Sequence, residues 1–147
     1  MNDMNAVEIL LVEDNPRDAE LTIRALKKNN LANKLFHVED GVEALDFLFA
    51  RGVYEGRTTD DPPKVVLLDL KLPRINGLEV LSAIRADPRT QTIPVVIVTS
   101  SAEDPDVKTA YQLGANSYVI KPVQFDSFMD AMTKLGVYWL MVNHPPK

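Results

Sequence analysis

The sequence has no cysteine among its 147 residues and only two histidines, His37 and His144. The lack of cysteine excludes disulfides, thiolate catalysis and cysteine-ligated metal sites, and two histidines are too few for a histidine-rich metal site. No apolar run approaches the roughly 18 residues that span a membrane, and the N-terminus lacks the basic and apolar segments of a secretory signal. A chain without cysteine tolerates a reducing cytoplasm, and we expect a cytoplasmic protein with no membrane partner.

Charge and composition exclude two further classes. The formal net charge is −5, with 46% hydrophobic and 25% charged residues. This composition is typical of a folded globular domain and not of a disordered chain. The negative charge disfavours non-specific binding to nucleic acid, so no nucleic-acid partner is expected. The length fits one domain, which we place at residues 7–147 after an N-terminal tail at 1–6.

Five short runs rich in β-branched and other apolar residues are typical of β-strands. They occupy residues 8–12, 34–38, 65–68, 95–98 and 117–120. The first, third and fourth runs are almost wholly apolar, which favours strands that are buried on both faces of a parallel sheet.

Amphipathic stretches separate these runs and carry helix-end signals. Asn15 before Pro16 is a good N-cap followed by a first-position proline, and Gly114 follows a helical pattern as a C-terminal glycine should. We expect helices over residues 16–29, 40–50, about 78–84, 104–113 and about 124–141. The alternation of strand and helix predicts a doubly wound α/β fold, a five-stranded parallel sheet with helices on both faces.

The residues at the ends of the predicted strands form a chemical set. In a parallel sheet these ends meet at one edge, where ligands bind. The ends carry Glu13, Asp14, Asp69, Thr99 and Lys121. Three gathered carboxylates would repel one another without a cation, and an all-oxygen set favours Mg²⁺ or Mn²⁺. A cation, an ammonium and a hydroxyl around Asp69 suit phosphoryl transfer to that carboxylate.

Four segments, in order, resemble the receiver domains of bacterial two-component response regulators. They are ILLVEDNP at 9–16, VVLLDLKLP at 65–73, IPVVIVTSS at 93–101 and LGANSYVIKPV at 113–123. The resemblance covers essentially the whole chain from about residue 7. It implies a flavodoxin-like (βα)5 fold with the strand order 2-1-3-4-5 and a Mg²⁺-dependent transfer of a phosphoryl group from a sensor histidine kinase. Catalysis would be limited to the domain's own phosphorylation and dephosphorylation.

The resemblance also implies which residues accept the phosphoryl group and bind the metal. Asp69 resembles the phospho-acceptor and, with Asp14, a direct metal ligand. Glu13 would hold a metal-bound water, and Lys71 would contribute its backbone carbonyl oxygen to the metal.

A second group of residues resembles the switch of the family. Thr99 matches the hydroxyl that moves toward the phosphoryl group, and Tyr118 matches the aromatic residue that follows it. Lys121 matches the lysine that pairs with the phosphoryl group. By the same analogy we expect a cis peptide bond between Lys121 and Pro122, an isomer found in only about 5–6% of X–Pro bonds.

A narrower resemblance points to stand-alone response regulators that serve bacterial phytochrome kinases. It rests on the extended loop around residues 51–54, the Asp-Pro pair at 87–88 and the Tyr-Trp pair at 138–139. It implies a bacteriophytochrome-type histidine kinase as the partner. With no output domain expected after the last helix, the signal would leave by protein contact or by onward phosphotransfer.

The C-terminal region, an extension of the last helix at about 135–147, is unusually apolar. Its LGVYWLMV segment could pack as additional core, or it could form an exposed surface for self-association. The resemblance favours a homodimer through this region, with Tyr138, Trp139 and Met141 on the dimer surface.

Three other functions fit parts of the pattern. An aspartyl-phosphate hydrolase would place a second aspartate where Lys71 stands. A flavin or nucleotide binder on the same fold would need a phosphate-binding loop richer in Gly, Ser or Thr than the EDNPRD segment. A docking module that works without phosphorylation, a pseudo-receiver, stays as the main alternative.

Overall fold

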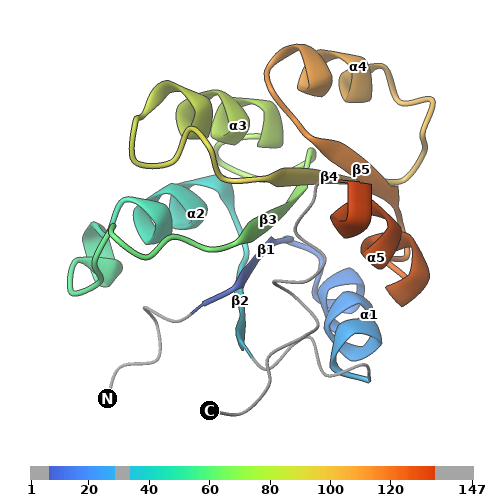
Figure 1. Cartoon of the computed structure of the whole chain (residues 1–147), viewed down its shortest axis with the longest axis horizontal. Helices are drawn as coiled ribbons and strands as arrows, with labels where there is room; N and C mark the ends of the chain where they lie inside the picture. Colours follow the sequence, from blue (N-terminus) through green and yellow to red (C-terminus); the bar gives the residue numbers. More distant parts are fainter. Residues whose placement is uncertain (1–6, 29–33, 135–147) are drawn as a thin grey trace.

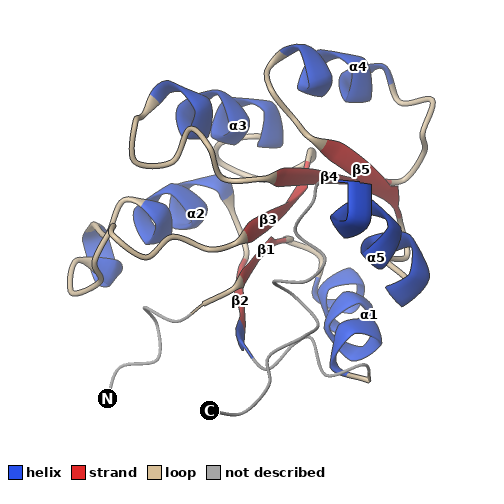
Figure 2. Ribbon diagram, viewed as in Figure 1, coloured by secondary structure: helices blue, strands red, loops and turns tan. Residues whose placement is uncertain are grey.

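The computed structural model describes residues 7–28 and 34–134, which form a central parallel sheet with helices on both faces (Figures 1 and 2). The strands are β1 (Ile9–Val12), β2 (Leu35–Val38), β3 (Val65–Asp69), β4 (Val95–Thr99) and β5 (Ser117–Ile120). All pairings are parallel, and the strand order is β2-β1-β3-β4-β5. This confirms the predicted fold class, including the strand order that the resemblance implied.

The helices follow the strands in the predicted alternation. They are α1 (Pro16–Lys27), α2 (Gly41–Leu48), α3 (Gly77–Ala86), α4 (Pro105–Gln112) and α5 (Phe125–Lys134), with one 3-10 turn, η3 (Gly52–Tyr54). The prediction for α2 ran two residues too far, because Ala50 adopts a positive φ of 52° that no α-helix continues. The proposed continuation of α5 lies outside the described residues.

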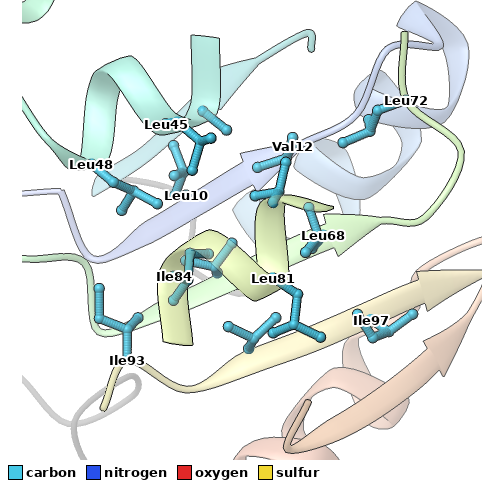
Figure 3. Packing of buried hydrophobic residues seen from close by; sticks show 14 of the residues in the cluster. Leu10, Val12, Leu45, Leu48, Leu68, Leu72, Leu81, Ile84, Ile93 and Ile97 are labelled. Carbon is cyan, nitrogen blue, oxygen red and sulfur yellow. The ribbon is translucent and has the colours of Figure 1, made fainter. Parts of the chain in front are cut away.

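Alternation along the strands divides the core into two layers. Leu10 and Val12 of β1 point into the layer that includes residues of α2, α3 and α4 (Figure 3). Ile9 and Leu11 of the same strand point into the layer that α1 and α5 cover. Every residue of β1, β3 and β4 is buried, as expected for strands covered on both faces.

Helix caps that the sequence indicated are present. The Asn15 side chain accepts hydrogen bonds from the backbone N–H groups of Arg17 and Asp18, at 2.9 and 3.0 Å. The Asp40 side chain accepts one from the N–H of Glu43 at 2.7 Å. Each cap satisfies donors that the first helical turn leaves without partners. The cap at Asn15 fixes where α1 begins relative to the end of β1.

The long polar loop before β3 is more ordered than its composition indicates. Tyr54 packs edge-on against the rings of Phe36 and Phe47, with centroids 5.8 and 5.2 Å away. Its hydroxyl donates to Glu43 Oε2 at 2.8 Å. The guanidinium of Arg57 lies over the Phe47 ring, 3.8 Å from the centroid. The loop is thereby attached to α2 and to the edge strand β2.

One arginine connects α3 to the segments that precede β4 and β5. The Arg85 guanidinium donates four hydrogen bonds of 2.8 to 3.0 Å, to the carbonyl oxygens of Gln91, Ile93 and Gly114 and to Asn116 Oδ1. Gly114 has a φ of 111°, and a Cβ there would meet the Arg85 side chain. A glycine is therefore required at this turn for conformation and for space.

Candidate functional site

The polar strand-end residues lie at the carboxyl edge of the sheet. Asp69 is the last residue of β3 and Thr99 is the last residue of β4. Glu13 directly follows β1, and Lys121 directly follows β5. Because neighbouring strands run parallel and in register, with Val12 beside Leu68, residues distant in sequence arrive at one edge.

A lysine joins three carboxylates at this edge. Lys121 Nζ lies 2.8 Å from Asp69 Oδ2, 3.0 Å from Glu13 Oε1 and 3.0 Å from Asp18 Oδ2. The side chains of Glu13 and Asp69 are only 2% and 8% exposed. Burial weakens solvent screening, so these are stronger interactions than ion pairs on an open surface.

The carboxylates also fit a divalent cation. One oxygen each from Glu13, Asp14 and Asp69 lies within 4.8 Å of the others. Asp14 is exposed, whereas Glu13 and Asp69 are buried, so the group opens to solvent on the Asp14 side. Oxygen donors of this kind suit a hard divalent cation such as Mg²⁺ or Mn²⁺.

Burial and the neighbouring negative charge raise the pKa of Glu13. Burial, a hydrogen bond to Asp69 and repulsion from its carboxylate raise the pKa of Glu13 from 4.5 to about 7, although a hydrogen bond from Lys121 acts in the opposite direction. Burial by itself would lower the pKa of Lys121, but its hydrogen bonds to Asp69, Asp18 and Glu13 raise it above its ordinary range. Lys121 is therefore a permanent cation, and it offsets part of the charge of its three partners.

Backbone contacts hold the Asp69 side chain and the loop that follows it. The N–H of Lys71 donates to Asp69 Oδ1 at 3.1 Å, so the second carboxylate oxygen is oriented by the chain that follows β3. The N–H of Gly77 donates to the Leu70 carbonyl at 2.9 Å. A Cβ on Gly77 would overlap the carbonyl oxygen of Asp69. Glycine at this position lets α3 pack directly against the backbone of Asp69.

Thr99 and Tyr118 lie on the expected strands, β4 and β5, and contact neighbouring residues of the loop after β4 and of α4. The Thr99 hydroxyl is buried, donates to the Ser101 carbonyl at 3.0 Å and accepts from the Ser101 N–H at 3.3 Å. Tyr118 is half-buried on β5, and its ring meets the Tyr111 ring edge-on with centroids 6.3 Å apart. The Lys121–Pro122 peptide bond is cis, as predicted.

Asp18 is the site residue that the sequence analysis missed. It lies in the first turn of α1, where Asn15 caps the helix. A signal was available, because a helix that follows a parallel strand closely begins at that strand's carboxyl end. An acidic residue in its first turn is thus a candidate for the same edge. The expected dimer residues Tyr138, Trp139 and Met141 lie outside the described residues.

Comparison with known proteins decides the family. Residues 9–133 match the family described as the response regulator receiver domain. The chain belongs to this family. Receiver-domain response regulators accept a phosphoryl group on an aspartate, and theirs is a signalling family, not a classical enzyme family.

Three relatives illustrate the match. The probable methanogenesis regulatory protein FilR2 of Methanothrix harundinacea is 41% identical over 94% of this chain and 86% of its own length. The bacteriophytochrome response regulator AtBRR is 51% identical, with a TM-score of 0.84 over 94% of this chain and 98% of that chain.

The third relative is the response regulator Rcp1 of Synechocystis, 36% identical over 90% of this chain and 88% of its own length. A Mn²⁺-bound structure of Rcp1 superimposes with a TM-score of 0.73 at 35% identity, covering 96% of this chain and 99% of that chain. The relatives thus include stand-alone regulators, phytochrome regulators among them, and one that has been seen with a divalent metal. This supports divalent metal binding in the family and a histidine kinase partner.

Within the described residues, none of the helices combines the length and the apolar character that a membrane crossing requires.

Proposed function

We propose that Asp69 is the aspartate that accepts the phosphoryl group and that its modification changes a protein-binding surface of this response regulator. One observation carries the assignment. Asp69 Oδ2 lies 2.8 Å from the ammonium of Lys121, beside the carboxylates of Glu13 and Asp14. No other aspartate among the described residues combines burial at the sheet edge with a lysine and two neighbouring acidic groups.

The chemistry follows from this arrangement. A carboxylate oxygen of Asp69 attacks the phosphorus of a phosphohistidine in line with the phosphorus–nitrogen bond. The new oxygen–phosphorus bond forms as the phosphorus–nitrogen bond breaks. The electron pair of the broken bond stays on the nitrogen, and the imidazole leaves as a neutral ring because its other nitrogen already carries a proton. The Lys121 ammonium stabilises the charge on the phosphoryl oxygens, because it is fixed at the acceptor before the reaction begins. This is the only chemistry proposed for the domain, together with hydrolysis of the acyl phosphate it forms.

We propose Mg²⁺ as the resident cation, with Mn²⁺ as a substitute. Asp14 and Asp69 would bind it directly, Lys71 through its backbone carbonyl, and Glu13 through a water molecule. When bound, the cation supplies neutralisation of the charge on the transferring phosphoryl group. The donor set supports this choice, because it is made only of oxygen atoms and leaves room for water on the exposed Asp14 side.

The switch would begin at Thr99. A phosphoryl group on Asp69 offers the Thr99 hydroxyl a charged acceptor in place of the Ser101 carbonyl. Movement of Thr99 would free space for the half-buried ring of Tyr118, which contacts Tyr111 of α4. A phosphoryl group shifts this equilibrium only as far as its contacts differ between the two states, typically about 1–3 kcal/mol. The surface that would change comprises α4, β5 and α5.

We further propose a bacteriophytochrome-type histidine kinase as the donor and a homodimer through residues beyond α5, with Tyr138, Trp139 and Met141 at the interface. The likeness to two bacteriophytochrome response regulators, 48% and 51% identical, supports the donor. The apolar LGVYWLMV segment supports the interface. One domain over residues 7–147 and a cytoplasmic location belong to the same proposal.

Intact-mass analysis tests the acceptor. The protein is incubated with acetyl phosphate and Mg²⁺, then with acetyl phosphate and a chelator. We expect a gain of one phosphoryl group that requires Mg²⁺ and is absent in Asp69→Asn. The matched control is Asp126→Asn, which removes an exposed acid from the first turn of α5 and should gain the same mass as wild type. An equal gain in Asp69→Asn contradicts the acceptor assignment.

Incubation with a phosphorylated histidine kinase and a measurement of kinase binding, added to this experiment, decide between phosphorylation and the docking-module alternative. A wild-type protein that stays unmodified with both acetyl phosphate and a phosphorylated histidine kinase, yet binds that kinase, would support a pseudo-receiver.

A further inference from the structure

We propose that Asp18 is a positioning residue for Lys121. It holds the ammonium in place when a cation lies beside Glu13 and a phosphoryl group is bonded to Asp69. The inference rests on the proposed function of Asp69. It adds a fourth acidic residue, from helix α1, to the machinery of phosphoryl transfer.

Asp18 and Lys121 form an ion pair, and the backbone of Asp18 is fixed by the helix cap. Asp18 Oδ2 lies 3.0 Å from Lys121 Nζ, as near as the closest oxygen of Glu13. Asp18 is held in the first turn of α1 by its own backbone N–H, which donates to Asn15 Oδ1 at 3.0 Å. The side chain of Asp18 therefore approaches Lys121 from a capped helix end rather than from a free loop.

The three partners of Lys121 are not equivalent. Glu13 and Asp69 belong to the carboxylate group that fits a cation, and Asp18 does not. The Asp18 side chain is 34% exposed, while those of Glu13 and Asp69 are 2% and 8% exposed. The ammonium has three N–H donors, and each of the three carboxylates accepts from it.

Phosphorylation of Asp69 changes how the three carboxylates share the Lys121 ammonium. Once an oxygen of Asp69 is bonded to phosphorus in the acyl phosphate, Asp69 no longer carries the carboxylate charge, and Glu13 lies beside any cation that the three clustered carboxylates bind. Asp18 is then the carboxylate that still holds Lys121 from the α1 side. An ammonium anchored on one side keeps its other donors directed at the phosphoryl oxygens, which makes its stabilisation of the transfer pre-organised.

The test compares the initial rate of phosphorylation by acetyl phosphate at saturating Mg²⁺ in wild type and Asp18→Asn. We expect a rate about fivefold lower in Asp18→Asn, a coupling ordinary for side chains in direct contact. The matched control is Glu20→Gln in the same helix. Glu20 is an exposed acid that pairs with Arg24 and not with Lys121. Its rate should equal that of wild type.

A double-mutant cycle separates positioning from a general effect of charge or folding. Asp18→Asn is combined with Lys121→Ala, and the affinity of each variant for beryllofluoride with Mg²⁺ is measured by NMR titration. Asp18→Asn should weaken beryllofluoride binding about fivefold in the wild-type background and leave it unchanged without Lys121. An equal loss in both backgrounds, or a rate in Asp18→Asn equal to wild type, overturns the proposal for Asp18 alone. A wild type that gains no phosphoryl group refutes the function of Asp69 instead.

Discussion

Asp69 and Lys121 lie 52 residues apart in the sequence, yet the Asp69 Oδ2 and Lys121 Nζ atoms are separated by 2.8 Å. The two residues come from the ends of β3 and β5, which are not neighbours, because β4 lies between them. The pair is thus a consequence of the sheet order and not of any local motif.

Removing Lys121 should destabilise the cation-free protein. Lys121→Ala leaves the buried carboxylates of Glu13 and Asp69 without their counter-charge, and we expect the free energy of unfolding to fall by about 3 kcal/mol. Added Mg²⁺ should recover part of this loss by taking the place of the ammonium charge. Urea denaturation with and without Mg²⁺ measures both effects.

The control for that experiment is Lys134→Ala. Lys134 pairs with Asp130 on an exposed face of α5, with both side chains more than half exposed, so we expect no measurable change in the free energy of unfolding. Equal losses for the two variants would show that the strand-end pair has no special role in stability.

Glu13 should give the cation-free protein a distinctive pH dependence. Its pKa is about 7 in the folded state and 4.5 ordinarily, so the folded state binds this proton more tightly than the unfolded state. The free energy of unfolding should therefore decrease as pH rises from about 4.5 to about 7 and be insensitive to Glu13 outside that window. Denaturation in the presence of a chelator, at a series of pH values, measures the slope.

Glu13→Gln isolates this contribution, because the amide has no proton to lose in that range. The difference in unfolding free energy between wild type and Glu13→Gln should change with pH between about 4.5 and 7. A difference that is constant over the window would mean that Glu13 ionises normally.

Arg85 should be a main source of stability away from the site. Arg85→Met removes four hydrogen bonds to partners before β4 and β5 while keeping a stem of similar length. We expect a loss of about 2 kcal/mol, since three backbone carbonyls lose a charged donor. Thermal or chemical unfolding measures it. Arg74→Met, which removes only an exposed contact with Asp40 at 3.7 Å, should change stability little; a comparable loss there would contradict the account.

The apolar segment after α5 should control association. Wild-type protein is expected to sediment as a dimer at micromolar concentration, and Trp139→Glu as a monomer, because a charge cannot be buried in an apolar interface without a partner. Analytical ultracentrifugation distinguishes the two. A monomeric wild type would refute the dimer surface formed by Tyr138, Trp139 and Met141.

The strands and caps could be predicted because their signals are local. The run at residues 65–68 is wholly apolar, so its composition alone indicates burial, and Asn15 followed by Pro16 indicates a helix start from two adjacent residues. The loop before β3 could not be predicted, because Tyr54 is ordered by rings of β2 and α2 that its own segment does not reveal. Thr99 belongs to both cases. Its place at the end of β4 was predictable, but its hydrogen bonds to Ser101 were not.

By itself the sequence determined which chemical groups stand at the strand ends, since strand periodicity and a parallel topology send Glu13, Asp69 and Lys121 to one edge. Tertiary structure alone decided how those groups share their charges. The position of α1 against the sheet places Asp18 3.0 Å from Lys121, and burial beside Asp69 raises the pKa of Glu13. Both depend on distances and desolvation between elements, quantities that are set only when the layers pack together.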